Sequence, residues 1–275
     1  MTQHPLGILA CQIDIPTMTT AHQRDMHLAA TAAKVRAALQ ETPADLVVLP
    51  ELSSMDYSRA AFDNLDVLAE PLDGPSFQSW RQVAQDYNCH VAYSFARRDD
   101  TGTYISLAVV NPAGALVGHY DKLHLAQYGA SMEKDYFTRG NHLFTFTVNG
   151  LTFAPIICYD IRIPELTRSL VLDHGADVIL HSGAYYRDAS FATWHDFTTT
   201  RALENQVFFL SLNRAGEHYG NSRLCYPWMD ENRPPVRFAE HDEQLINLVI
   251  DPAEIAAARQ TYTFLKDRLP SYTKL

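Results

Sequence analysis

The chain has 275 residues, of which 47% are hydrophobic and 20% charged, and its formal net charge is −10. Its 22 lysine and arginine residues are scattered rather than gathered in a stripe or tail, which argues against nucleic acid and anionic membrane as partners. No apolar stretch approaches the roughly 20 residues of a membrane helix, so we expect a soluble protein. The four cysteines are far apart and form no CxxC pair, which argues against a zinc site or a disulfide framework and fits a cytoplasmic location.

The chain shows no internal boundary. Gly/Ser linkers, low-complexity tracts and runs of like charge are all missing from the sequence, so we expect one domain over residues 1–275. Apolar runs with β-branched character alternate with segments of helical periodicity. This alternation is typical of a layered α/β fold.

The first half of the chain predicts strands, helices and a hairpin in turn. A helical face is formed by Leu28, Ala32, Val35 and Leu39, and residues 51–73 read as a loop before a second helix at 77–87. The residue types at 112–114 suit a tight turn between two strands. The predicted strands are residues 7–13, 46–49, 91–94, 104–111 and 116–120.

The second half repeats this alternation. Asn149-Gly150 is a strong hairpin signal between two apolar runs. Pro164 suits a first helical residue, Leu166 and Leu170 share a face, and Gly175 is a plausible stop. Further helices are expected at residues 191–204 and from Pro252. The predicted strands are residues 144–148, 151–157, 178–180, 207–212 and 243–250.

A short internal echo indicates two similar halves. Ala44-Asp45 and Ala176-Asp177 each precede an apolar strand and follow an amphipathic helix. The echo favours a sandwich of two sheets between helical layers.

Three residues with useful chemistry follow predicted strands. Cys158 ends an apolar strand just before a helix start, where a helix N-terminus would favour a thiolate. Glu51 follows the run that ends at Pro50, and Lys122 follows residues 116–120. Alone, each has an ordinary explanation: a small core residue, a loop acid and a surface charge. Together they supply a nucleophile, an acid-base group and a positive oxyanion partner, which hydrolysis of an amide by a thiol requires.

The sequence resembles the nitrilase superfamily, the carbon–nitrogen hydrolases. The resemblance is carried by three blocks in the order typical of the family, and further matches extend over nearly the whole chain. The blocks are Val48-Leu-Pro-Glu51, Tyr120-Asp-Lys122-Leu-His-Leu and Cys158-Tyr-Asp-Ile-Arg-Ile-Pro-Glu165.

The resemblance implies a four-layer α-β-β-α sandwich, a homodimer or larger assembly, and an enzyme without metal or organic cofactor. It makes Glu51 the general base, Lys122 the oxyanion stabiliser and Cys158 the nucleophile. Glu133 matches a second glutamate that orients the lysine and the substrate. The backbone N–H of Tyr159 is expected to be a second oxyanion donor.

The cysteine context is similar to the amidase branch, including ω-amidase-like proteins, so we expect a small-molecule amide as substrate. A nitrilase, an N-carbamoyl amidohydrolase and a non-catalytic binding protein on the same fold are the alternatives. Residues 182–187, with an arginine at 187, are expected to form a pocket wall that continues through Trp194 and His195 and admits aliphatic, aromatic or carboxylate-bearing amides. The expected binding residues are Tyr57, Tyr159, Ala184, Tyr185 and Trp194.

The chain has twelve histidines, three of them near the predicted site. These three are His124, His181 and His195. Neither an HExxH motif nor another metal-ligand spacing is present, so we expect them to support the site through hydrogen bonds.

Overall fold

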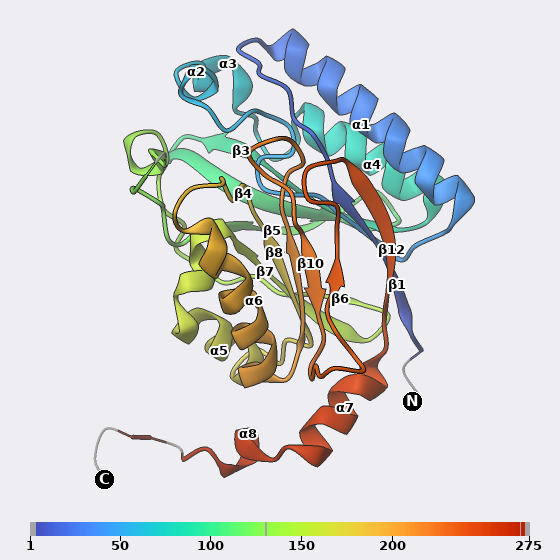
Figure 1. Ribbon diagram of the computed structural model, residues 1–275. Helices are drawn as coiled ribbons and strands as arrows, with labels where there is room; N and C mark the ends of the chain where they lie inside the picture. The colour runs from blue at the N-terminus through green and yellow to red at the C-terminus, as the bar shows by residue number, and fades with distance from the viewer. Residues whose placement is uncertain (1–3, 130, 270, 273–275) are drawn as a thin grey trace.

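Two six-stranded sheets pack against each other between helical layers in the computed structural model, which describes residues 4–129, 131–269 and 271–272 (Figure 1). The first sheet has the order β12-β1-β2-β3-β4-β5 and the second β11-β10-β9-β8-β7-β6. This is the expected α-β-β-α sandwich.

The strands of the first sheet are β1 (Leu6–Gln12), β2 (Leu46–Val48), β3 (His90–Asp99), β4 (Gly102–Val110), β5 (Leu116–Asp121) and β12 (Gln244–Ile250). Those of the second sheet are β6 (Phe146–Val148), β7 (Leu151–Ile157), β8 (Val178–Ser182), β9 (Phe208–Leu212), β10 (Arg223–Cys225) and β11 (Val236–Arg237). The predicted Asn149-Gly150 hairpin joins β6 to β7, and both turn residues have positive φ angles, as a two-residue hairpin turn requires.

Helices cover the outer face of each sheet (Figure 1). The layer on the first sheet consists of α1 (Ala21–Glu41) and α4 (Pro75–Tyr87), and the layer on the second consists of α5 (Pro164–Leu172) and α6 (Phe191–Asn205). Pro164 opens α5, and Leu166 and Leu170 are buried on its inner face, as predicted. At the end of the chain, α7 (Pro252–Thr261) and α8 (Phe264–Asp267) extend away from the sandwich.

The two sheets share one internal plan. In each, three parallel strands lie side by side, β1-β2-β3 in one and β7-β8-β9 in the other. The aspartates of the two repeated Ala-Asp pairs make the same kind of hydrogen bond in both sheets. Asp45 accepts a hydrogen bond from the backbone N–H of Gly7 at 2.8 Å, and Asp177 accepts one from Thr152 at 3.0 Å. Each aspartate therefore ties the start of the second parallel strand to the first.

Several short elements differ from the sequence-based expectation. The predicted loop at residues 51–73 contains two single-turn helices, α2 (Arg59–Phe62) and α3 (Leu65–Leu68), while β10 and β11 were not expected. Elements of two to four residues are too short for a periodic pattern to reveal them. Within the described residues, none of the helices combines the length and the apolar character that crossing a membrane would require.

Candidate active site

The site lies where strands of both sheets end. Glu51 follows β2, Cys158 follows β7 and Ala184 follows β8. Lys122 follows β5, which runs in the direction of β2 and β3 because two antiparallel pairings separate it from β3. Parallel strands present their carboxyl ends at one edge of a sheet, and ligand crevices form there.

The central feature is a lysine held between two glutamates. The Nζ atom of Lys122 lies 2.8 Å from Oε1 of Glu51 and 2.7 Å from Oε1 of Glu133, and all three side chains are completely buried. Glu133 is the first residue of a one-turn 3-10 helix, Glu133–Asp135. Its carboxylate also accepts hydrogen bonds from the Tyr57 hydroxyl at 2.7 Å and from the backbone N–H of Ala126 at 2.8 Å.

The charges of this group stabilise one another. Burial opposes the charged form of Lys122, but Glu133 and Glu51 outweigh it and raise the pKa of the ammonium well above its usual range. Burial and the charge of Glu133 raise the pKa of Glu51, although Lys122 works in the opposite direction. The second oxygen of Glu51 accepts a hydrogen bond from the backbone N–H of Ala184 at 2.8 Å.

Cys158 has a strained backbone. Its φ angle is +46°, a left-handed conformation that a residue with a side chain adopts at a cost of about 1–3 kcal/mol. It starts the 3-10 helix Cys158–Arg162, and its carbonyl oxygen accepts hydrogen bonds from His181 Nε2 at 2.9 Å and from the Tyr185 hydroxyl at 3.4 Å. Such strain is typical of functional sites.

The surroundings of Cys158 favour a protonated thiol, although a helix N-terminus alone would favour a thiolate. Burial, followed by the charge of Glu51, raises the pKa of the thiol well above its usual range, and the charge of Lys122 does not offset this. The sequence indicated a helix start, but the short 3-10 turn cannot outweigh burial beside two carboxylates. A thiol in such surroundings needs a base to remove its proton before it can act as a nucleophile.

Asp160 joins the lysine and cysteine segments. Its carboxylate accepts hydrogen bonds from the Tyr120 hydroxyl at 2.7 Å and from the backbone N–H of Ile157 at 3.0 Å. It also binds His124 through the backbone N–H at 3.0 Å and the ring Nδ1 at 2.7 Å. In the sequence, Tyr120 and His124 lie on either side of Lys122, and Ile157 directly precedes Cys158. The role of Asp160 was missed, because the sequence shows the motif but not its partners.

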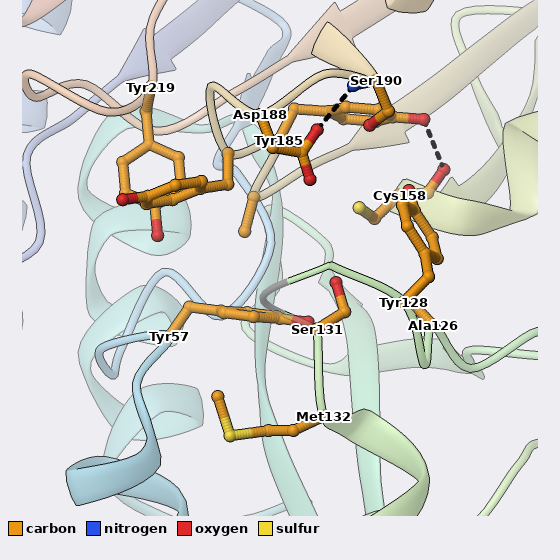
Figure 2. Close-up of a pocket in the computed structure, with 12 residues that line it drawn as sticks. Tyr57, Ala126, Tyr128, Ser131, Met132, Cys158, Tyr185, Asp188, Ser190 and Tyr219 are labelled. Carbon is orange, nitrogen blue, oxygen red and sulfur yellow. Dashed lines mark hydrogen bonds between the residues drawn. The ribbon is translucent and has the colours of Figure 1, made fainter.

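The Cys158 side chain faces a cavity of about 180 Å³ (Figure 2). Three predicted binding residues line it, namely Tyr57, Ala184 and Tyr185. The other described residues of its wall are Ala126, Tyr128, Ser131, Met132, Tyr186, Asp188, Ser190 and Tyr219, which the sequence did not single out except for Tyr186.

Three other residues of the predicted site do not line the cavity with their side chains. Trp194 is buried behind Tyr185, and the two rings are stacked with centroids 4.9 Å apart. The ring of Tyr159 packs against Tyr128, so its backbone, not its side chain, is next to Cys158. The expectation that Arg187 forms the pocket wall is wrong. Its guanidinium donates to the backbone carbonyls of Tyr219 and Glu240 at 2.8 and 2.7 Å.

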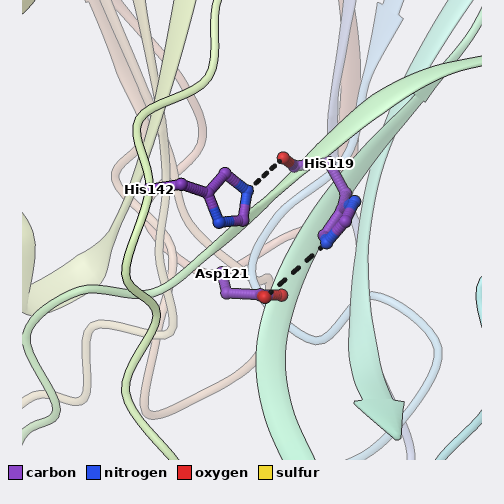
Figure 3. Close-up of side chains that lie close together, drawn as sticks. All are labelled: His119, Asp121 and His142. Carbon is purple, nitrogen blue, oxygen red and sulfur yellow. Dashed lines mark hydrogen bonds and ion pairs between the residues drawn. The ribbon is translucent and has the colours of Figure 1, made fainter. Parts of the chain in front are cut away.

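His119, Asp121 and His142 form the group of described residues that could hold a metal ion (Figure 3). Their ligand atoms lie within 4.8 Å of one another. Asp121, however, already receives two hydrogen bonds from Arg97 at 3.0 and 2.8 Å and one from Ser106. The arginine neutralises this carboxylate. The ion pair between Arg97 and Asp121 links β3 to the end of β5, directly before Lys122.

A cysteine facing a cavity above a buried set of ionisable groups at strand ends defines an enzyme site. Comparison with known proteins specifies the class. Residues 8–260 match the family described as carbon–nitrogen hydrolase, so the chain belongs to that family and is an enzyme that hydrolyses carbon–nitrogen bonds.

Two curated relatives are amidases. The chain is 32% identical to a 2-oxoglutaramate amidase of Bacillus subtilis over 231 residues, 82% of this chain and 85% of the relative. It is 30% identical to an (R)-stereoselective amidase of a Pseudomonas species, with coverages of 82% and 79%. The crystal structure of Saccharomyces cerevisiae Nit3, a nitrilase-superfamily member, has a TM-score of 0.81 at 24% identity and 94% coverage of both chains, a likeness of fold.

Proposed function

We propose that this enzyme hydrolyses the carbon–nitrogen bond of a small amide through a thioester on Cys158. The observation that carries the proposal is the buried Lys122 between Glu51 and Glu133, directly beside a cysteine that faces a cavity. The family membership and the amidase relatives support the choice of an amide.

Glu51 acts as the general base and then as the general acid. Its carboxylate takes the thiol proton as the sulfur of Cys158 attacks the amide carbon. When the tetrahedral intermediate collapses, Glu51 returns that proton to the departing ammonia or amine. Glu51 next takes a proton from water, whose oxygen attacks the thioester carbon, and the proton finally returns to the cysteine sulfur as the acid leaves.

Lys122 and the backbone N–H of Tyr159 stabilise the oxyanion. The raised pKa of Lys122, caused by its two glutamate partners despite burial, supports a permanently charged ammonium. Tyr159 lies in the first turn of a 3-10 helix, where backbone N–H groups lack an intrahelical partner. Glu133 holds the ammonium in position and is itself fixed by Tyr57.

The alternatives are less well supported. A nitrile would form a thioimidate that must gain water before it loses ammonia, and a carbamoyl substrate would use the same groups. The curated relatives named above favour the amide. A non-catalytic binding protein would have no need for a buried lysine held by two buried carboxylates, an arrangement that is costly unless fully paired.

Cys158→Ala tests the proposal. The variant should lose ammonia release from every accepted amide, while its yield and melting temperature stay near those of the parent. With hydroxylamine present, the parent should give a hydroxamate in place of part of the acid, because the added nucleophile intercepts the thioester. Retained turnover in Cys158→Ala would contradict the mechanism. Faster turnover of nitriles than of the matching amides would favour a nitrilase.

The protein is also proposed to form a cytoplasmic homodimer or a larger homo-oligomer, through α5 and the C-terminal segment. The C-terminal segment extends from the body and exposes Phe264, Leu269 and Tyr272, and apolar surface of this kind often marks an interface. Light scattering at micromolar concentration tests assembly. A fully active monomer would contradict it.

A further inference from the structure

Away from the buried Lys122 group, the described wall of the cavity that Cys158 faces holds one carboxylate and no cationic side chain. Among the described residues of its wall, Asp188 is the acidic side chain, and neither lysine nor arginine is present. Two arginines close in sequence to wall residues have other partners. Arg187 donates to the backbone carbonyls of Tyr219 and Glu240, and Arg162 donates to the Tyr128 hydroxyl at 3.1 Å.

Asp188 presents a free oxygen to the cavity. One oxygen accepts a hydrogen bond from the backbone N–H of Ser190 at 2.7 Å, and the other points toward the open centre (Figure 2). That second oxygen lies beside Gly129, where an added Cβ would come within 2.9 Å of it. Within the described part of the chain, Asp188 has no lysine, arginine or histidine within ion-pair distance.

The rest of the wall is rich in aromatic faces. Five tyrosines line the cavity, and tyrosine rings attract cations placed over their faces. These are Tyr57, Tyr128, Tyr185, Tyr186 and Tyr219. The formal net charge of −10 adds a long-range field of the same sign, which attracts cations and repels anions.

We infer that this enzyme prefers amides whose acyl group carries a protonated amine, and that Asp188 is the residue that selects them. The inference rests on the proposed amidase function and specifies its substrate class. A carboxylate-bearing amide would bring a second negative charge to Asp188, which has no ion-pair partner among the described residues, and an unpaired charge in a partly buried site is costly. The cavity of about 180 Å³ limits the acyl group to a short chain.

Three amides that share two methylene groups between the amide carbon and the terminal group test the inference, namely 3-aminopropanamide, butanamide and succinamate. They place an ammonium, a methyl group and a carboxylate at the far end of the acyl chain. We expect kcat/KM to be highest for 3-aminopropanamide and lowest for succinamate. In Asp188→Asn, the ratio of kcat/KM for 3-aminopropanamide to that for butanamide should fall at least about tenfold. The control Glu217→Gln, which removes an exposed acid from a neighbouring loop, should keep the parent ratio.

Each outcome bears on one proposal. If the parent hydrolyses succinamate faster than butanamide, or if Asp188→Asn keeps the parent ratio, the inference is overturned while the amidase function stands. If none of the amides reacts and mass spectrometry finds no Cys158 adduct, the proposed function itself is overturned. Because the readout is a ratio between two substrates of one protein, a loss of folded enzyme in Asp188→Asn cannot imitate the expected result.

Discussion

His181 Nε2 donates a hydrogen bond to the carbonyl oxygen of Cys158 across 2.9 Å. The partners of His181 fix this direction. Trp194 Nε1 can only donate, and it donates to the Ser211 hydroxyl at 2.9 Å. The Ser211 hydroxyl keeps its own hydrogen free and can donate it to His181 Nδ1, which lies 2.6 Å away. Since a carbonyl only accepts, Nε2 carries the ring hydrogen, and the chain of donors ends on the strained residue that bears the thiol.

Replacing His181 tests whether this chain positions the thiol. His181→Leu should lower kcat by about 10- to 100-fold with little change in KM, because a small displacement of a reacting group has effects of this size. His181→Gln should recover most of the loss, since its amide N–H₂ can reach the Cys158 carbonyl. Melting temperatures of both variants provide the control. Equal losses of kcat in the two variants would mean that His181 only fills space.

The same histidine should make stability depend on pH. Burial lowers the pKa of His181 to about 4, whereas the unfolded side chain titrates near 6.5. Between these values the unfolded state binds a proton that the folded state excludes, so stability is lost as the pH falls. The loss from this group is about 3 kcal/mol. Urea unfolding from pH 7 to pH 4 measures it, and His181→Gln should show a shallower slope than the parent. Parallel slopes would refute the assignment.

Lys122→Met should reduce kcat by at least roughly 10²-fold, the usual effect of removing a main oxyanion donor. It also leaves two buried glutamates without their counter-charge, so the melting temperature should fall as well. Lys134→Met, which changes an exposed lysine in the neighbouring segment, is the matched control and should resemble the parent. A defect confined to KM would assign Lys122 to substrate binding alone.

Much of the fold could be predicted because long apolar runs and amphipathic helices have clear periods. The helix at α5 and the hairpin at Asn149-Gly150 were predicted from local signals that the structure retains. The strand β3 was predicted too short, because Arg97 and Arg98 end its apolar run while hydrogen bonding to β4 continues to Asp99. Pairing between distant segments decides such boundaries, and a sequence pattern does not report it.

The sequence predicted which residues form the site better than it predicted how they are arranged. Strand ends indicated Glu51, Lys122 and Cys158, and the structure brings them together, whereas Glu133 came from the family resemblance alone. The direction of a loop side chain is not encoded locally. Arg187 turns away to Glu240, which lies 53 residues further along the chain, and Asp188 faces the cavity instead. The state of the Cys158 thiol depended on burial by both sheets, which the sequence does not display.

The pH dependence of kcat/KM should follow Glu51, because the proposed mechanism requires this residue to be a carboxylate in the free enzyme in order to take the thiol proton. Burial, together with the charge of Glu133, raises its pKa above the ordinary value of 4.5. Activity should therefore rise with pH through a midpoint above 4.5. Lys122 gives no competing limb near neutrality, since its two carboxylate partners overcome burial and raise its pKa. Initial rates at low substrate concentration from pH 4 to pH 9 measure the profile.

Glu133→Gln tests the assignment of the acid limb to Glu51 through the direction in which the midpoint of that limb moves. The charge of Glu133 raises the pKa of Glu51, so removing that charge should move the acid limb of the residual activity to lower pH. The glutamine keeps one oxygen that can accept hydrogen bonds from Lys122 and Tyr57 but loses the acceptor of the Ala126 N–H, so the readout is the position of the acid limb and not the rate. A parent midpoint at or below 4.5, or a limb that moves to higher pH in Glu133→Gln, would show that a group other than Glu51 is the base.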